Sequence, residues 1–358
     1  MGPLAGVRVL DLSRVLAGPW ASQLLADLGA DVVKVEAPGR GDDTRHWGPP
    51  ELVAGEAAYF HAANRGKRSI ALDLARDRET LLALVDRADV VIENFKVGGL
   101  ARYGLDYPSL KARRPALIYC SITGFGQDGP WAQRPGYDLL IQGLGGLMSI
   151  TGQPDEAPGG GPVKVGVALV DILTGLYATI GIQAALRHRE RTGEGQQIDL
   201  ALLDVSVAVL ANQAMNYLAT GQAPGRLGNG HPNIVPYDVY PTRDGHLILA
   251  VGNDGQFAQL CHAAGLPELA QDERFATNAQ RTRNRKDLES ALELAMLQKT
   301  IDEWVALGEQ NGFPCGPINS IDRVFADPQI RARDMIVRTS EGYDLVANPI
   351  RFSATPIT

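Results

Sequence analysis

Cysteine is scarce in this sequence of 358 residues. The three cysteines, Cys120, Cys261 and Cys315, stand far apart, and no Cys-x-x-Cys motif occurs. This usage argues against a disulfide framework and against a zinc-ribbon type of site. The six histidines contain no pair at metal-ligand spacing either, so we expect no metal ion.

Long apolar runs and an excess of positive charge are also missing. No apolar stretch approaches the roughly 20 residues that span a bilayer, and the N-terminus lacks the charged and apolar segments of a signal peptide. The net charge is −7, whereas nucleic-acid binding favours a basic surface. We therefore expect a cytoplasmic protein without membrane or nucleic-acid partners.

Three motifs of nucleotide and hydrolase chemistry do not occur. No Gly-x-Gly-x-x-Gly follows the first apolar run, no Walker A loop is present, and no Gly-x-Ser-x-Gly elbow is found. A redox nucleotide cofactor is therefore not predicted. A Ser-His-Asp triad stays open, because its members can come in several orders along a chain.

The first third alternates between strand-like and helix-like runs. Near-continuous apolar runs with strand character stand at residues 7–12, 31–35, 69–74, 89–95 and 115–122. Helical periodicity lies between them at 20–28 and 77–87, and Pro19 and Gly29 fit the ends of the first helix. Strands that are apolar throughout are typical of a parallel sheet covered on both faces. The prediction is an α/β fold with a Rossmann-like, doubly wound large domain.

The rest of the chain predicts a smaller α+β domain. A long helix is expected at 172–189 and a mostly apolar one at 198–218, before a linker rich in Gly, Pro and Asn. Further on come a strand at 246–251 and two amphipathic helices, at 285–298 and 301–311. The predicted domains are a large one at 1–196, a helix and linker at 197–229, and a small domain at 230–315.

Asp171 stands at the start of the predicted long helix. As an N-cap its carboxylate would accept backbone N–H bonds and contribute about 1 kcal/mol. The helix dipole and these amides would also keep the carboxylate ionised, which a carboxylate nucleophile requires. Spacing alone leaves both interpretations open.

Glycines and basic side chains supply the other candidates. The glycines Gly143, Gly145 and Gly146 can bring backbone amides close to a substrate oxygen, or can simply form a turn. Basic residues crowd the first third, several at strand ends, where phosphates bind in open α/β sheets, although a solvated mixed-charge surface would look the same. These residues predict a protein that binds an anionic small molecule, without fixing a reaction.

A series of short motifs, in order along nearly the whole chain, resembles the class III (CaiB/BaiF-type) coenzyme A-transferases. Characteristic examples are Leu16-Ala17-Gly18-Pro19, Asn64-Arg65-Gly66-Lys67-Arg68, Gly136-Tyr137-Asp138, Thr192-Gly193-Glu194-Gly195-Gln196 and Gly312-Phe313-Pro314-Cys315-Gly316-Pro317. The resemblance implies an interlocked homodimer. It also implies a C-terminal segment, 316–358, that returns to the large domain.

The resemblance implies that Asp171 is the nucleophile. In such enzymes the aspartate attacks an acyl-CoA and forms an acyl-aspartyl anhydride, which the released thiolate converts to an aspartyl-CoA thioester. Gly143, Gly145 and Gly146 would then be the oxyanion or lid residues that exclude water. Acyl-CoA racemases of the same fold are the alternative. They carry Gly-His-Asp where this chain has Gly136-Tyr137-Asp138, and tyrosine is a poor base at neutral pH.

Coenzyme A, bound as the acyl-CoA substrate, is the one cofactor that the resemblance implies. The matching positions are Leu72, Asn94, Phe95 and Arg102. Ala37 stands where formyl-CoA transferase has an arginine near the phosphates, and Lys34 or Arg40 is expected to compensate. Leu16 and Tyr137 are the expected substrate-pocket residues. Leu16 replaces a glutamine of formyl-CoA transferase, which argues against oxalate or formate.

The motif at 231–237 and the word Gly316-Pro317-Ile318-Asn319 resemble the branch that acts on dicarboxylic acids, nearest to succinyl-CoA:glutarate CoA-transferase. The expected donor is succinyl-CoA, and glutarate, itaconate, malate and citramalate are candidate acceptors. Relatives usually end in a proline-rich segment and a Leu-Gly-x-His-Thr word. Neither is found here, so a shortened tail is expected.

Overall fold

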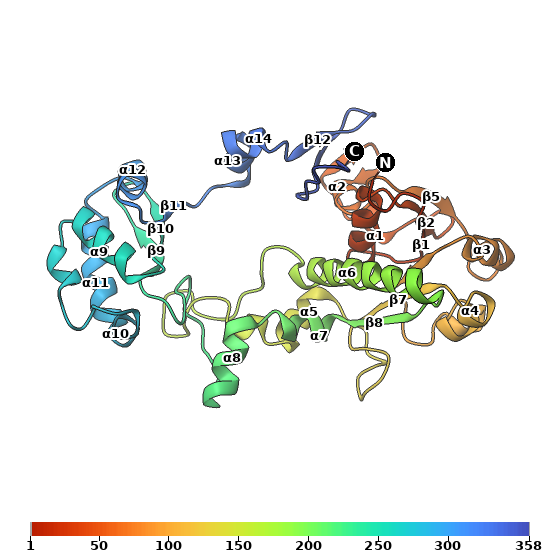
Figure 1. Ribbon diagram of the computed structural model, residues 1–358, viewed down its shortest axis with the longest axis horizontal. Coiled ribbons are helices and arrows are strands. Elements are labelled where there is room, and N and C mark those ends of the chain that lie inside the picture. Colours follow the sequence, from red (N-terminus) through yellow and green to blue (C-terminus); the bar gives the residue numbers. More distant parts are fainter. Residues whose placement is uncertain (1, 358) are drawn as a thin grey trace. The chain divides into compact units, whose positions relative to one another are not determined.

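The computed structural model describes residues 2–357 and divides into two compact units (Figure 1). Unit 1 contains the residues up to 148, residues 164–211 and the residues from 329 onward. Unit 2 contains residues 149–163 and 212–328. These boundaries fall at other residues than the predicted domain boundaries, because residues 149–163 and 316–328 make their contacts within unit 2.

Unit 1 is built on a parallel sheet of six strands in the order β5-β2-β1-β6-β7-β8. The strands are β1 (Arg8–Asp11), β2 (Asp31–Glu36), β5 (Arg68–Ala71), β6 (Val90–Glu93), β7 (Ile118–Thr123) and β8 (Gln197–Ala201). The strand order reverses between β1 and β6. This arrangement confirms the predicted Rossmann-like, doubly wound fold and places the expected ligand crevice at the carboxyl ends of these strands.

Helices cover both faces of the sheet (Figure 1). α1 (Ala17–Asp27) and α6 (Leu169–Thr192) share a buried core with Val9 of β1. On the other face, Leu10 packs with side chains of α3 (Arg78–Val85) and α4 (Tyr107–Arg113). Consecutive strand residues point to opposite faces, so the unbroken apolar runs of the sequence bury both faces at once.

The helix predicted at 198–218 is wrong. Residues 197–201 form the edge strand β8, and the helices α7 (Leu202–Ala208) and α8 (Ala211–Thr220) follow. Ile198 and Leu200 alternate with polar residues, a period of two that the surrounding apolar run obscures. Ala211 has φ of 47°, which ends one helix and redirects the next.

The remaining elements of unit 1 are short. They are β3 (Glu51–Val53), β4 (Glu56–Ala57), α2 (Ala58–His61), α5 (Asp138–Leu144), β12 (Ile336–Arg338), β13 (Asp344–Val346) and the 3-10 turns Asp43–His46 and Ala101–Tyr103. The C-terminal segment is tied to this unit by Arg65, which donates to the carbonyl oxygen of Val346 at 2.8 Å, and by Asn348, which donates to Asp27 at 2.9 Å.

Unit 2 has an antiparallel three-stranded sheet, ordered β11-β10-β9, with helices around it. Its main elements are β9 (Tyr237–Pro241), β10 (His246–Ala250), α9 (Asp254–Ala263), α10 (Asn278–Arg283), α11 (Arg285–Met296), α12 (Ile301–Asn311), β11 (Cys315–Pro317) and α13 (Ile321–Ala326). The 3-10 turn Pro267–Ala270 also belongs to unit 2, whereas the turn Leu147–Ser149 and the helix α14 (Pro328–Ala332) each span a boundary between the two units. The buried Trp304 and Phe257 lie in a separate core, as a small α+β domain requires.

Within residues 2–357, α6 is the one helix that is long and apolar enough to cross a membrane. The sequence was expected to contain no such run. The helix has a window of mean hydropathy 1.5, of which 44% is buried inside the protein. Its inner face packs on α1, so the apolar composition serves the core of unit 1.

Candidate active site

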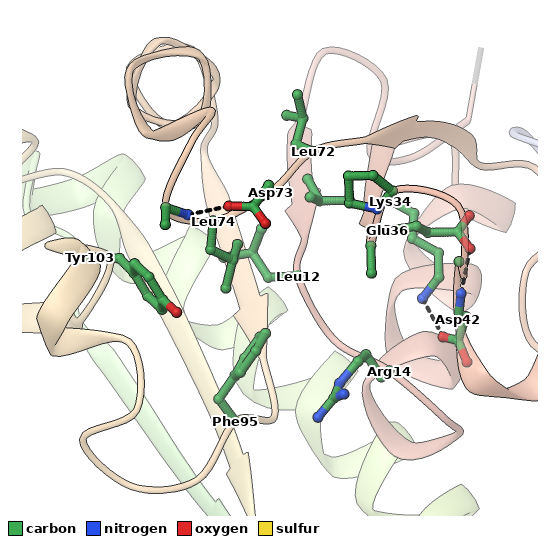
Figure 2. A pocket seen from close by; sticks show the side chains of 15 residues that line it. Leu12, Arg14, Lys34, Glu36, Asp42, Leu72, Asp73, Leu74, Phe95 and Tyr103 are labelled. Carbon is green, nitrogen blue, oxygen red and sulfur yellow. Dashed lines mark hydrogen bonds and ion pairs between the residues drawn. The ribbon is translucent and has the colours of Figure 1, made fainter.

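A cavity of about 260 Å³ opens at the carboxyl edge of the main sheet (Figure 2). Its walls come from the segments that follow β1, β2, β5 and β6. The lining residues include Leu12, Arg14, Lys34, Glu36, Asp42, Leu72, Leu74, Phe95 and Tyr103. This is the edge at which doubly wound sheets bind their ligands.

Three predicted coenzyme A residues, Leu72, Phe95 and Lys34, line this cavity. The Lys34 side chain is only 2% exposed, and its Nζ lies 2.9 Å from Asp42 Oδ2 and 2.8 Å from the carbonyl oxygen of Ser13. Its charge is therefore engaged inside the protein, and no free ammonium faces a phosphate. A lysine at a strand end looks the same in the sequence whether it faces inward or outward.

Three exposed arginines lie in or next to the segments that line the cavity. Arg14, which the sequence did not single out, lines the cavity, and its guanidinium lies 5.3 Å from the centre of the Phe95 ring. Arg40 is 72% exposed and forms an ion pair with Asp43 at 2.5 Å. Arg102 lies over the ring of the cavity residue Tyr103, at 4.6 Å. Flexible guanidinium groups at this edge suit phosphate recognition.

Asn94 holds the loop after β1, which is a different role from lining the cavity. Its Nδ2 donates to the carbonyl oxygen of Arg14 at 2.6 Å, and its Oδ1 accepts from the Arg14 amide at 2.9 Å. This pair of bonds fixes the backbone that carries the Arg14 guanidinium.

The whole loop at residues 13–16 is held in place. The Ser13 amide donates to Asp11 Oδ1 at 2.9 Å, and the Val15 amide donates to Asp42 at 3.3 Å. Val15 has φ of 71°, a strained conformation for a β-branched residue, which persists only where the surroundings enforce it. Leu16, expected in the substrate pocket, is 5% exposed and directly precedes α1.

Asp171 is the third residue of α6 and is partly buried. Within residues 2–357 its carboxylate accepts no hydrogen bond. Burial raises the pKa of Asp171, and the neighbouring Asp138 raises it further, to about 7. Burial and Asp138 thus shift this pKa in the direction opposite to the one expected from the helix N-terminus.

Asp138 caps α6 in place of Asp171. Its Oδ1 accepts from the amide of Val170 at 2.8 Å and from the amide of Asp171 at 3.3 Å. The N-cap residue itself is Ala168, whose methyl side chain can accept no hydrogen bond. The cap thus comes from 32 residues earlier in the chain, a distance that sequence patterns do not report.

Two close backbone approaches set the positions of these carboxylates. A Cβ on Gly136 would lie 2.5 Å from the Cα of Gly124, so the segment leading into α5 passes directly over the end of β7. A Cβ on Gly175 would lie 2.8 Å from the carbonyl oxygen of Ala17. Asp171 is four residues before Gly175 and so lies on the same side of α6.

Because α1 and α6 both connect parallel strands, they run in the same direction across the sheet, from its carboxyl edge. The turn of α6 that precedes Gly175 therefore lies beside the loop that precedes Ala17, namely residues 13–16. This loop also reaches the cavity through Arg14. Asp171 and the cavity accordingly share the carboxyl edge of the sheet, on either side of the loop.

Two tyrosines belong to this neighbourhood. Burial raises the pKa of Tyr59 in α2, and the negative charges of Asp171 and Asp138 raise it further, so the phenol stays protonated. Nothing in the sequence singles out Tyr59, since it is one aromatic in a four-residue helix. Tyr137, an expected pocket residue, directly precedes Asp138 and is 66% exposed.

The glycines predicted as oxyanion or lid residues lie at the end of α5. A Cβ on Gly145 would lie 2.2 Å from the Oγ of Ser206 in α7, and one on Gly146 would meet Leu210 at 3.6 Å. A Cβ on Gly143 would meet the Sδ of Met148 at 3.8 Å. Close packing between α5 and α7 accounts for Gly145, and the lid role of all three stays a prediction.

In the part of the chain that the structure describes, no three His, Cys, Asp or Glu side chains gather closely enough to hold a metal ion. The candidate site thus combines the carboxylate of Asp171 with a cavity that Arg14 lines, both at the carboxyl edge of the sheet. A carboxylate without a hydrogen-bond partner is one of the side chains that can serve as a nucleophile toward an activated acyl group.

Comparison with known proteins identifies the family. The family model for CoA-transferase family III matches residues 4–358. The succinate–glutarate CoA-transferase of Agrobacterium fabrum is 56% identical over 366 residues, 99% of this chain and 90% of that protein. The succinyl-CoA:glutarate CoA-transferase of Mus musculus is 45% identical over 339 residues, 94% of this chain and 77% of that protein.

Among solved structures, a CAIB/BAIF family protein from Brucella suis has a TM-score of 0.88 and 56% identity, and the match covers 100% of this chain and 94% of that one. The chain belongs to CoA-transferase family III. It is therefore an enzyme that acts on coenzyme A thioesters.

Proposed function

We propose that this transferase moves coenzyme A from succinyl-CoA to a second dicarboxylic acid, with glutarate as the leading acceptor. The observation that carries the proposal is the carboxylate of Asp171, which accepts no hydrogen bond within residues 2–357 and lies at the carboxyl edge of the sheet. The donor and acceptor follow the names of the two relatives described above.

Asp171 is the nucleophile of the proposed reaction. One of its oxygens attacks the thioester carbon of succinyl-CoA, the carbon–sulfur bond breaks, and a succinyl-aspartyl anhydride and the coenzyme A thiolate result. The thiolate then attacks the aspartyl carbon of the anhydride, releasing succinate and leaving an aspartyl-CoA thioester. The acceptor carboxylate repeats these two steps in reverse order, and the Asp171 carboxylate is regenerated.

Coenzyme A would occupy the cavity at the carboxyl edge. The apolar walls at Leu72 and Phe95 suit the adenine and the pantetheine chain. Arg14 also lines the cavity, and its guanidinium can bind a phosphate. The thioester end would pass over the loop at 13–16 to reach Asp171. Arg40 and Arg102 stay candidates for further phosphate contacts.

The anhydride must be kept from water, so the proposal includes a covered site. Gly143, Gly145 and Gly146 are the proposed lid or oxyanion residues, and Leu16 and Tyr137 are the proposed pocket residues. We also propose that the enzyme works in the cytoplasm as an interlocked homodimer. The exposed apolar side chains of α6, including Leu176, Tyr177 and Ile180, support an interface between copies.

The test is a trapping experiment with intact-mass spectrometry. Wild-type protein and Asp171→Ala are each mixed with succinyl-CoA and then treated with hydroxylamine or borohydride. We expect a hydroxamate or a reduced adduct that maps to position 171 in the wild type and is absent from the variant. A panel of glutarate, itaconate, malate and citramalate then identifies the acceptor by the thioester formed.

The racemase alternative predicts a different result. An acyl-CoA racemase would exchange the α-proton of a branched acyl-CoA with deuterated solvent and would form no covalent adduct. Deuterium incorporation without an adduct at Asp171 would replace the proposed transfer by racemisation.

A further inference from the structure

The carboxylates of Asp138 and Asp171 both lie at the first turn of α6. Within residues 2–357, Asp138 accepts hydrogen bonds there and Asp171 accepts none. We propose that Asp138 is a positioning residue for coenzyme A transfer: it takes the backbone amides of α6 and leaves Asp171 as an unpaired carboxylate beside a fixed negative charge. This inference rests on the proposed function, in which Asp171 is the nucleophile.

Both carboxylate oxygens of Asp138 accept hydrogen bonds. Its Oδ1 accepts the amides of Val170 and Asp171 at 2.8 and 3.3 Å. Its Oδ2 accepts from Nε2 of Gln142 at 2.6 Å, and Oε1 of Gln142 accepts from the amide of Val165 at 2.9 Å. Gln142 is fully buried. This chain of bonds ties α5, the segment before α6 and the first turn of α6 into one unit.

The arrangement changes the chemistry of Asp171. A carboxylate that accepts helix amides is stabilised as an anion, which makes it a weaker base and a weaker nucleophile. Here Asp138 uses those amides, while Asp171 has only burial and a like charge nearby. Both effects raise the pKa of Asp171, to about 7, so its anion is more basic than an ordinary aspartate.

Other titratable groups do not explain this difference. Tyr59 on α2 is electrostatically coupled to both carboxylates but is itself held protonated. The titratable side chains on the other elements packed against α6 are Asp27 on α1, Tyr119 and Cys120 on β7, Asp199 on β8 and Asp204 on α7. None of them shifts the pKa of Asp171, which responds to burial and to Asp138.

The decisive variant is Asp138→Asn. Its amide oxygen can still accept from α6, but its negative charge is gone. We expect the acidic limb of the pH profile of kcat/KM to move down by roughly one pH unit. At the wild-type optimum kcat should fall by up to about 10-fold, because the nucleophile is about one pKa unit less basic, while KM for succinyl-CoA changes little.

A second variant guards against loss of folding. In Asp138→Asn the new NH₂ group faces the NH₂ group of Gln142. Combining it with Gln142→Glu restores a complementary hydrogen bond and the original net charge, with the charge moved away from Asp171. The acidic limb of this double variant should lie between those of wild type and Asp138→Asn, and its melting temperature should match the wild type. Glu79→Gln on the exposed surface serves as the charge-loss control.

The outcomes separate the two proposals. If Asp171→Ala still forms the trapped adduct, the proposed function is wrong whatever the Asp138 variants do. If Asp171 is required but the pH profiles of both Asp138 variants coincide with that of the wild type, Asp138 is only structural and this inference is wrong. Loss of stability in Asp138→Asn, with a normal profile in the stable double variant, also overturns it.

Discussion

At the scale of single residues, unit 1 contains buried charged side chains that form several hydrogen bonds or ion pairs. Glu36, at the end of β2, is an example: its side chain is 4% exposed and accepts from Arg45 Nη2 at 2.7 Å. It also accepts from the Asp42 amide at 2.8 Å and from the Ser69 hydroxyl at 2.5 Å. Burial alone would raise the pKa of Glu36, but these hydrogen bonds outweigh it and lower the pKa to about 2.

This residue predicts a dependence of stability on acid. The pKa of Glu36 is lower in the folded protein, about 2, than the ordinary 4.5, so its contribution is complete above pH 4.5 and disappears as the pH falls toward 2. Glu36→Gln should lose about 3 kcal/mol of unfolding free energy at pH 7. It should lose much less at pH 3, as measured by urea denaturation at both values.

Glu79→Gln is the matched control, because Glu79 is 87% exposed and pairs only with the adjacent Arg78. Its unfolding free energy should stay within about 0.5 kcal/mol of the wild type at both pH values. An equal loss in Glu36→Gln at pH 7 and pH 3 would contradict the assigned ionic role.

The residue scale is also where sequence reasoning fell short. Asp171 was identified through the resemblance, but its surroundings were not, because Asp138 reaches it from 33 residues away. Lys34 and Arg14 both stand at the end of or just after a strand. Only the folded chain distinguishes the inward lysine from the arginine that lines the cavity.

At the scale of elements, the contact between α1 and α6 determines where Asp171, the proposed nucleophile, lies. Gly175 allows the two helices to touch at the carbonyl oxygen of Ala17 and at Trp20. The fold could be predicted from the sequence, because its near-continuous apolar strands alternate with helices that have recognisable end signals. This pattern is typical of a doubly wound sheet. The edge strand β8 was missed, because its alternating pattern is five residues long and continues into α7.

The helix contact can be tested with an alanine. The Cβ in Gly175→Ala would lie 2.8 Å from backbone oxygen, which side-chain motion cannot relieve. We expect a loss of about 1–3 kcal/mol in unfolding free energy and a larger loss of kcat than of donor binding, because the first turn of α6 must shift.

Gly181→Ala in the same helix is the control. Its Cβ would meet only the end of the Ile198 side chain, at 3.3 Å. Alanine favours a helix interior by about 1 kcal/mol over glycine, so this variant should be neutral or more stable. Similar behaviour of the two variants in thermal melts and turnover would show that the close approach at Ala17 has no special role.

At the scale of the whole molecule, apolar side chains remain exposed on both units, on α6 in unit 1 and on α8, most of which belongs to unit 2. Ile180 is 62% exposed on α6, and Met215 and Leu218 on α8 are 62% and 71% exposed. Exposed apolar side chains in such number are unusual for a monomer and typical of an interface.

The proposed homodimer gives the corresponding prediction. Light scattering after gel filtration should report twice the chain mass of 38.4 kDa. Ile180→Asp should weaken the dimer and reduce transfer activity, whereas Leu294→Asp, which changes an equally exposed leucine on α11, should do neither. A monomeric, fully active wild type would remove the homodimer from the proposal.

The contact between Gly124 and Gly136 has an evolutionary consequence. Every amino acid except glycine carries a Cβ atom, and at either position that atom would lie within about 2.7 Å of backbone on the other strand of the crossing. No missense mutation at these two codons can therefore preserve the path that brings Asp138 to the start of α6. A lineage that inherits this crossing can alter its substrate through neighbouring side chains, but it cannot change the crossing itself one codon at a time.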